Sequence, residues 1–556
     1  MTPMDDLRLF TKEVRRDVAD RLQPSARTAW RPLAPIQRLV LRFERQRWVL
    51  PAVAVLFLAA THEILRSTLT LPLGVLSSVG LLLMVSFLVA ALYAYVRSQQ
   101  PKQVRRPRSL VLLGTVILVV LLLIRLGLVV NTALHHSFPH IPLSALRAAL
   151  PVPLGGVLLT ILFNVRLAFA GSLVLTILAG VMLEAPIEYF LFTFVGSLVG
   201  IFSLAGRQGR TAFFRAGSAL ALANLYSVLS LGLLTGNTDA MAAAMLGGVV
   251  NGLVVAILAT GLLPLLEHSF GVTTDFTLLE LSNLNLPALR HLALMAPGTY
   301  YHSIMVGTLA EAAADAIGAN GLLCRVGAYY HDIGKVRHPG YFIENHSDAV
   351  NPHDKLAPSL SKAIVMSHVK DGLEMAQASG LPEVLADMIP QHHGTRLVTF
   401  FYKRAKEQTD PGLQEIKEED YRYPGPKPQT REAAILMLAD AVEAAARTLT
   451  DPTPARIQGA VQKIINGIFV EGQLDECDLT LRDLHLIANS FARILTGIFH
   501  HRVDYPGVVL QEVGPKRNGD GDQSAKPAKD GPRRDPVAKK PGPEGPARLE
   551  VPDGGG

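Results

Sequence analysis

The sequence has little cysteine, little charge and few aromatic residues. Of 556 residues only 2 are cysteine, 18% are charged and 6% are aromatic. Cys324 and Cys477 lie far apart and form no Cys-x-x-Cys motif, so neither a disulfide framework nor a thiolate zinc site is indicated, and the segments around them are expected in a reducing cytosol. The charged fraction lies below the roughly 25% of an average globular protein, while 49% of the residues are hydrophobic and the mean hydropathy is +0.28. Collagen-like, disulfide-scaffold and wholly disordered proteins are excluded, and a membrane protein of several units is favoured.

Long apolar segments between residues 48 and 264 predict a transmembrane domain. Each is close to the length of about 20 residues that crosses a bilayer as a helix. About eight helices are expected, at 48–66, 75–96, 109–131, 144–164, 167–184, 187–205, 213–235 and 241–264. Asn224 and Asn251 within these helices are expected to bond neighbouring helices. A transport pathway is a minor alternative, since no interrupted helix pair or central acidic cluster is present.

The basic residues predict the orientation of these helices. Residues 1–47 are rich in arginine and lack the short leader of a cleaved signal peptide, so we expect an uncleaved cytoplasmic segment. Lysine or arginine occurs in every second connection, at 97–108, 166 and 207–215, and is missing from those at 67–74, 132–143, 185–186 and 236–240. Because basic loops stay inside, both termini are expected in the cytoplasm of a protein of the bacterial inner membrane. The net charge of +6 is modest, and the informative feature is the position of the basic residues in these loops.

The rest of the chain divides into three segments. Residues 265–298 are predicted to form an amphipathic connector, and 299–507 a soluble domain whose apolar residues recur at helical spacing. Residues 514–556 are dominated by Gly, Pro, Lys and Asp and are predicted to be a disordered tail. The expected fold class is therefore all-α, with a polytopic helical membrane domain followed by a cytoplasmic helical bundle.

Histidine and aspartate residues recur in the soluble domain as an ordered set. Its members are His302, His331, Asp332, His368, His392, His393 and Asp440. A lone histidine in a helix is more often a packed or surface residue, so the prediction rests on the whole set. Imidazole and carboxylate suit divalent Fe, Mn, Co or Zn, and seven such groups are too many for one ion, so two ions are expected. Asp440 lies in an otherwise apolar run, from Ala433 to Val442, where a bound cation would balance its charge. Thr299 is expected to cap the helix that carries His302.

The strings around these residues resemble a known family. The ordered set resembles the HD-domain metal-dependent phosphohydrolases, and the longer strings resemble the bacterial seven-transmembrane receptors with an intracellular HD domain. The strings are Ala296-Pro-Gly-Thr-Tyr-Tyr-His-Ser303, Val326-Gly-Ala-Tyr-Tyr-His-Asp-Ile-Gly-Lys335, Asn351-Pro-His-Asp-Lys355, Ser367-His-Val-Lys-Asp-Gly372 and Tyr423-Pro-Gly-Pro-Lys-Pro-Gln429. The resemblance covers roughly residues 75–507. That family normally has a large extracellular domain after its first membrane helix. Here the short loop at 67–74 occupies that place, which argues against ligand sensing through such a domain.

The resemblance implies roles for all seven residues of the set. One ion would be held by His302, His331 and Asp440, the other by His368, His392 and His393, with Asp332 bridging the two. Fe or Mn is expected at both positions, where two ions can activate a water for attack on a phosphodiester.

Further residues near the set are candidates for catalysis or substrate binding. Asp332 and Lys335 are the expected catalytic residues. Lys335 would neutralise phosphate charge or order the site, and an equal alternative is that it only complements the end of its helix. The residues next to the ligands are candidates for contacts with the nucleotide, namely Tyr300, Tyr301, Thr395 and Arg396.

The expected function is second-messenger signalling by a membrane-anchored phosphodiesterase. Some members of the family are cyclic di-AMP phosphodiesterases, so hydrolysis of cyclic di-AMP to linear pApA is expected. Gly394-Thr-Arg-Leu-Val follows the paired histidines, where the related enzymes for cyclic di-GMP have a Gly-Tyr-Pro motif. The alternatives are another nucleotide phosphohydrolase, or a membrane receptor that acts mainly through protein contacts. The expected partners are a cyclic dinucleotide and the lipid bilayer, with no DNA or RNA duplex, and a homodimer is left open.

Overall fold

The structure is a computed structural model, and it describes most of the chain between residues 49 and 499. The described ranges are 49–69, 74–100, 107–185, 187–206, 209, 211–236, 238, 240–346, 351–408 and 416–499. The predicted N-terminal segment (1–47) and tail (514–556) lie outside them, as do Lys102, Arg105, Arg106, Arg207 and Arg210 of the basic loops. Within the described residues the chain forms helices and a single isolated β-bridge between Leu397 and Arg422, which confirms the all-α fold class.

Six helices of the described residues are long and apolar enough to cross a membrane. They are α4 (Val75–Gln99), α6 (Pro107–Ser137), α9 (Val165–Met182), α10 (Ile187–Leu204), α11 (Thr211–Thr235) and α12 (Met241–Phe270). The first predicted span corresponds to α3 (Val49–Arg66), which does not belong to these six. The chain is therefore a multi-pass membrane protein.

The prediction of one helix over 144–164 is wrong. The structure has two short helices there, α7 (Leu143–Ala148) and α8 (Leu154–Leu162). Pro151 and Pro153 lie between them, and proline removes a backbone donor and breaks a helix. Helix α8 is largely buried and contacts α6, α9, α10 and α12, so this segment fills the interior of the bundle instead of crossing it as one rod.

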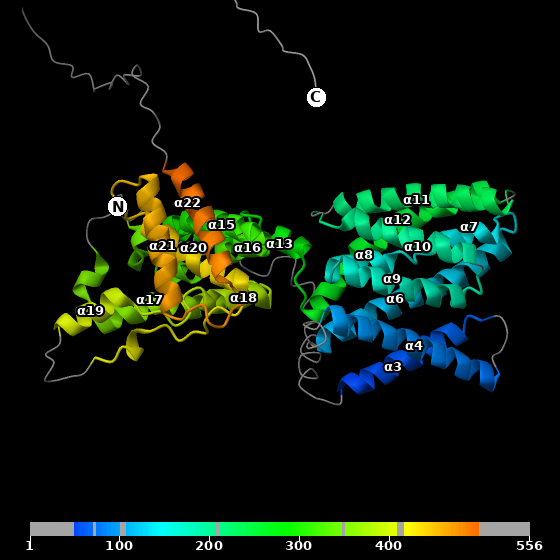
Figure 1. The fold of residues 1–556 in the computed structure, drawn as a ribbon, viewed down its shortest axis with the longest axis horizontal. Helices are drawn as coiled ribbons and strands as arrows, with labels where there is room; N and C mark the ends of the chain where they lie inside the picture. The colour runs from blue at the N-terminus through cyan, green and yellow to red at the C-terminus, as the bar shows by residue number, and fades with distance from the viewer. Residues whose placement is uncertain are drawn as a thin grey trace, which may run out of the picture. The chain divides into compact units, whose positions relative to one another are not determined.

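Helices α11 and α12 lie side by side at very short distance (Figure 1). A Cβ atom added to Gly217 would lie 2.7 Å from the carbonyl oxygen of Gly252, so only glycine permits this approach. The Asn224 amide donates to the Gly248 carbonyl (2.9 Å) and to Asn251 Oδ1 (3.1 Å). Asn251 in turn donates to the carbonyl of Leu150. The prediction that the two asparagines bond neighbouring helices is confirmed.

The second part of the chain is a bundle with its own hydrophobic core, which extends from Leu278 to Leu495. Its helices are α13 (Asp275–Leu281), α14 (Pro287–Met295), α15 (Pro297–Ala316), α16 (Gly321–Tyr330), α17 (Pro358–Ala378), α18 (Glu383–Gln391), α19 (Thr399–Gln408), α20 (Arg431–Ala446), α21 (Pro454–Val470) and α22 (Leu481–Ile498). Short 3-10 turns join them, η2 (Ile333–Arg337), η3 (Pro339–Tyr341), η4 (Ile343–Asn345), η5 (Pro352–Lys355) and η6 (Glu419–Tyr421). Helix α20 is the central element, because every residue from Ala433 to Ala439 is buried.

Two sequence expectations about this bundle need adjustment. The predicted connector contributes Leu278, Leu281 and Leu289 to the core, so α13 and α14 are part of the bundle's packing. The prediction that Thr299 caps the helix of His302 is wrong, because α15 starts at Pro297 with Ala296 as its N-cap. Proline fits this first position because its missing N–H has no helical partner there in any case.

Candidate metal centre

Five helices bring the seven predicted residues to one place in the bundle. His302 lies in α15, His331 and Asp332 directly follow α16, and His368 lies in α17. His392 and His393 directly follow α18, and Asp440 lies in α20. Asn320 is the N-cap of α16, and its side chain accepts from the Leu323 amide, so a local cap fixes where this helix starts.

The donor atoms form two overlapping groups. One group contains His302, His331 and Asp332, the other contains Asp332, His368, His392 and His393, and within each group the ligand-type atoms lie within 4.8 Å of one another. Asp440 joins the first group, with Oδ1 3.0 Å from His302 Nε2 and 3.9 Å from His331 Nε2. Asp332 is shared, because its Oδ2 lies 3.2 Å from His331 Nε2 and its Oδ1 lies 3.4 Å from His368 Nε2.

Three of the histidines face the centre with the same nitrogen. The Nδ1 atoms of His331, His368 and His392 each lie 2.6 Å from a backbone carbonyl oxygen three residues earlier in the chain. This hydrogen bond assigns the proton to Nδ1 and leaves the lone pair on Nε2.

Two of these nitrogens and one oxygen of Asp332 have no hydrogen-bond partner among the described residues, whereas His368 Nε2 lies 3.2 Å from His393 Nε2. His331 Nε2, His392 Nε2 and Asp332 Oδ1 are buried without a hydrogen-bond partner. Buried acceptors of this kind are costly unless a partner satisfies them, and a cation is the partner that suits several converging acceptors. The cluster is therefore compatible with metal binding.

The electrostatics keep four of the donor groups in the form that binds a metal. Burial, together with the neighbouring His331, lowers the pKa of His392 to about 3. Burial also lowers the pKa of His368 and of His393, so these imidazoles are neutral at pH 7. Burial alone would raise the pKa of Asp332, but His331 and Lys335 outweigh it and hold that pKa well below its ordinary value. Asp332 is thus an ionised carboxylate.

His302 differs from these four groups. Burial lowers its pKa, but the hydrogen bonds to Asp440 and Glu443 outweigh this and raise the pKa to about 10. His302 must therefore release a proton to bind a metal.

Lys335 is held between two carboxylates beside the cluster. Its Nζ lies 2.7 Å from Asp332 Oδ2 and 2.8 Å from Glu344 Oε1, and its side chain is only 14% exposed. The Thr299 hydroxyl donates to the same oxygen of Glu344 (3.0 Å). Burial lowers the pKa of Lys335, but the two carboxylates outweigh this and raise it, so Lys335 is a cation in the folded protein.

Two glycines permit the close backbone contacts around the cluster. A Cβ atom on Gly334 would lie 2.0 Å from the carbonyl oxygen of His368, where η2 packs against α17. A Cβ atom on Gly298 would lie 1.7 Å from the carbonyl oxygen of Glu344. The glycines of the Pro-Gly-Thr and Asp-Ile-Gly-Lys strings are therefore required because any side chain there would overlap the neighbouring backbone.

The four predicted nucleotide contacts occupy different environments. Tyr301 is 65% exposed, whereas Tyr300 is partly buried and packs against the small apolar cluster of Leu292, Ala296 and Val336. The Thr395 amide donates to Gln473 Oε1 (3.0 Å), and Arg396 Nε lies 3.8 Å from Glu471 Oε2. Their role in substrate binding stays a prediction.

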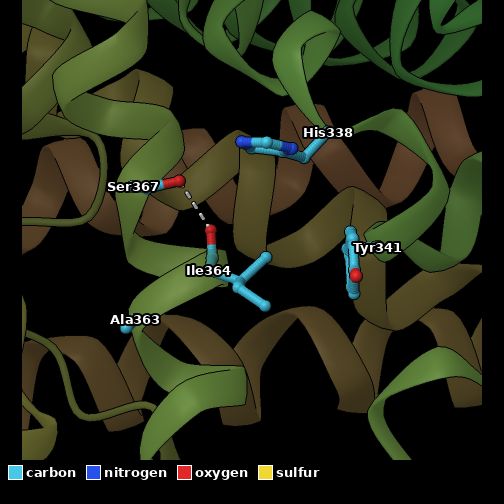
Figure 2. A pocket seen from close by; sticks show the side chains of 5 residues that line it. All are labelled: His338, Tyr341, Ala363, Ile364 and Ser367. Carbon is cyan, nitrogen blue, oxygen red and sulfur yellow. Dashed lines mark hydrogen bonds between the residues drawn. The ribbon is translucent and has the colours of Figure 1, made fainter. Parts of the chain in front are cut away.

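A separate pocket lies between α17 and the turns that follow the His-Asp pair. It has a volume of about 340 Å³ and is lined by His338, Tyr341, Ala363, Ile364 and Ser367. Figure 2 shows His338 and Tyr341 on one side, and Ile364 and Ser367 on the helix opposite. Neither the seven residues of the cluster nor the four predicted nucleotide contacts line this pocket.

Sequence reasoning missed two residues that touch the cluster, Tyr423 and Glu443, and a third, Glu344, that touches Lys335 beside it. The ring of Tyr423 stacks on His393 with 4.1 Å between the ring centroids. Glu443 lies 2.6 Å from His302 Nδ1, and a second carboxylate in the apolar run of α20 was a signal for it. Glu344 had no such local signal, because its contact with Lys335 depends on the path of the turns from η2 to η4.

Comparison with known proteins places this arrangement in a family. Residues 75–274 match the family described as 7TM receptor with intracellular HD hydrolase, and residues 299–445 match the HD domain. The chain belongs to this family of HD-domain membrane proteins. The resemblance inferred from the sequence strings is thereby confirmed.

Two curated relatives of this HD-domain protein carry the same name. It is 41% identical over 437 residues to the cyclic-di-AMP phosphodiesterase PgpH of Bacillus subtilis (strain 168), covering 77% of this chain and 60% of the relative. It is 36% identical over 432 residues to the PgpH of Listeria monocytogenes, covering 77% of this chain and 58% of the relative. The chain thus spans about 60% of the length of these relatives. A solved L. monocytogenes PgpH HD domain in complex with cyclic-di-AMP is 48% identical to this chain. The match covers 39% of this chain and 100% of the solved chain, with a TM-score of 0.37.

Proposed function

We propose that this protein is a membrane-anchored, metal-dependent phosphodiesterase that hydrolyses cyclic di-AMP to linear pApA. The observation that carries the proposal is the buried cluster in which unpaired acceptors of His331, His392 and Asp332 face one centre. The names of the two relatives, both cyclic-di-AMP phosphodiesterases, support the choice of substrate.

The proposed cofactors are two divalent ions, Fe or Mn. One would be held by His302, His331 and Asp440, and the other by His368, His392 and His393, while Asp332 contributes to both. When bound, such ions activate water and stabilise the negative charge that develops on the phosphoryl oxygens.

The chain's own residues prepare this site. Asp332 and Lys335 are the proposed catalytic residues. The ion pair between them (2.7 Å) favours the role in which Lys335 orders the site, and Glu344 (2.8 Å) fixes Lys335 from the other side. The exposed ring of Tyr301 is available to stack on a base, and Tyr300, Thr395 and Arg396 are retained as proposed nucleotide contacts.

The proposed location is the bacterial inner membrane, with both termini and the HD domain in the cytoplasm. The basic connections support this orientation. The proposed partners are therefore the bilayer and a cytoplasmic cyclic dinucleotide, with no DNA or RNA duplex. A homodimer remains open.

The decisive experiment is a substrate panel with one metal-loaded preparation of the full-length protein. Cyclic di-AMP, cyclic di-GMP, cyclic GMP-AMP and (p)ppGpp are incubated with protein loaded with Mn or Fe, and the products are separated by chromatography. We expect pApA from cyclic di-AMP, and we expect the activity to be lost in Asp332→Ala. Asp420→Ala changes an exposed aspartate and is the matched control. A metal-replete protein that is inert toward all cyclic dinucleotides would overturn the proposal.

A further inference from the structure

His302 is held differently from the other histidines of the cluster. His331, His368 and His392 each pair their Nδ1 atom with a backbone carbonyl. His302 Nδ1 instead lies 2.6 Å from Glu443 Oε2. A carboxylate is a stronger acceptor than a carbonyl, so the hydrogen bond from His302 is charge-assisted.

Glu443 is itself fixed in place. It is 4% exposed, and its second oxygen, Oε1, accepts from Arg447 Nε at 2.6 Å. Arg447 follows Glu443 by one helical turn and reaches the surface, where its side chain is 41% exposed. The carboxylate is thus charge-balanced on its outer side and bonded to a proposed metal ligand on its inner side.

One face of α20 therefore contacts both nitrogens of His302. Asp440 and Glu443 lie three residues apart in this helix and share a face. Asp440 Oδ1 lies 3.0 Å from His302 Nε2, and Glu443 Oε2 lies 2.6 Å from His302 Nδ1. Rotation of the His302 ring away from the centre would break the bond to Glu443.

We propose that Glu443 is a positioning residue, which fixes the tautomer and the orientation of His302 and strengthens Nε2 as an electron donor. It acts on only one of the two proposed ions, the one held by His302, His331 and Asp440. This inference rests on the ligand set of the proposed function, and it predicts that the two ions differ in their dependence on Glu443. Carboxylates that orient a ligating histidine commonly contribute 10–100-fold to metal affinity.

The test is Mn²⁺ binding to the full-length protein in detergent after its metals have been stripped. Calorimetry gives the affinity of each ion, and electron paramagnetic resonance distinguishes a coupled ion pair from an isolated ion. In Glu443→Gln we expect the affinity for one ion to fall by about 10–100-fold while the other stays unchanged. At limiting Mn²⁺ the spectrum should then show isolated ions.

The chain offers a matched control and an assignment of the affected ion. Glu311 also forms an ion pair with an arginine, Arg325 (2.8 Å), and it lies in α15 together with His302. Glu311→Gln should bind both ions as the wild type does. His302→Ala should weaken the same ion as Glu443→Gln, and the double variant should lose no more than His302→Ala alone, because the two residues act as a unit.

Three results would overturn the inference. These are unchanged affinities in Glu443→Gln and Glu443→Ala, an equal loss of both ions, or additive losses in the double variant. If the Glu443 variants do not fold, Arg447→Met is used instead, and unchanged affinities in this variant also overturn the inference. Metal binding is read independently of hydrolysis, so a wild type that binds two ions and cleaves nothing refutes the proposed function alone.

Discussion

At the scale of single residues, a short chain of charges links the surface turn η4 to the centre of the cluster. Asp332, Lys335 and Glu344 alternate in sign, and all three side chains are largely buried. Buried charges of this kind are stable only when each is paired with an opposite charge, because removal of one leaves its partner uncompensated. A bound cation would take over part of the role of Lys335 toward Asp332.

Lys335→Met should therefore destabilise the metal-free bundle more than the metal-loaded one. We expect a loss of about 3–5 kcal/mol without metal, because Asp332 and Glu344 then face each other unpaired, and a clearly smaller loss with Mn²⁺. Urea denaturation of a fragment of residues 274–499, followed by circular dichroism, measures both. Lys362→Met is the control, since Lys362 donates to the exposed backbone of Asp420 and lies over the ring of Tyr421, and it should change stability by no more than about 1 kcal/mol. Equal losses in the two metal states would contradict this explanation.

The low pKa of His392 predicts how the metal-free bundle responds to acid. The pKa is about 3 in the folded protein, against about 6.5 in an unfolded chain. Below about pH 6.5 His392 binds a proton in the unfolded chain but not in the folded bundle. The contribution of neutral His392 to the free energy of unfolding is therefore fully present above this pH and is lost as the pH falls toward 3. One such proton changes stability by up to about 1.4 kcal/mol per pH unit. His392→Gln should reduce the slope of unfolding free energy against pH between about pH 6.5 and 4 by this amount, which urea denaturation at a series of pH values measures.

The sequence could predict which residues form the cluster, but not which neighbouring side chains hold them in position. The seven residues of the cluster could be named because imidazole and carboxylate are rare inside apolar helices and stood in a recognisable order. Glu443 and Glu344 have roles that depend on which helix or turn lies opposite them. Such contacts between distant segments leave no periodic pattern in the sequence.

At the scale of elements, the approach of η2 to α17 sets the position of the His-Asp pair relative to His368. This approach depends on Gly334, as its Cβ position is occupied by the backbone of α17. Gly334→Ala should force the two elements apart and destabilise the bundle by about 2 kcal/mol or more. Gly340→Ala is a matched control, because nothing lies within 4 Å of the Cβ position of Gly340. Thermal denaturation compares the two variants with the wild type. Equal decreases of the melting temperature in Gly334→Ala and Gly340→Ala would disprove this steric explanation.

Helical periodicity explains which elements were foreseen. The long apolar helices such as α4 and α12 could be placed from hydropathy alone, because bilayer thickness sets their length. The division of 144–164 into α7 and α8 was missed because the run is mostly apolar, and an average of hydropathy does not detect the helix-breaking Pro151 and Pro153. The participation of α13 and α14 in the core was likewise hidden, since their few leucines resemble a generic amphipathic linker.

At the scale of the whole molecule, the distribution of basic residues makes a topological prediction. Ser98 at the end of α4 should face the cytoplasm, and Thr238 between α11 and α12 should face the outside. In a chain without Cys324 and Cys477, a membrane-impermeant maleimide applied to intact cells should label Thr238→Cys and spare Ser98→Cys. Labelling of Ser98→Cys alone would invert the proposed orientation and place the HD domain away from cytoplasmic nucleotides.

The cluster also joins five helices of the bundle. In this chain Cys324 and Cys477 are both free thiols, so no disulfide closes the loops between these helices. Ions held by residues as distant as His302 and Asp440 would act as reversible cross-links of the folded chain, and because they bind the native state and not the unfolded one they would stabilise it by mass action. Scarcity of metal would then lower not only the turnover of each molecule but also its lifetime, since unloaded copies open more often to proteases. The abundance of the protein in the cell would itself report the supply of metal.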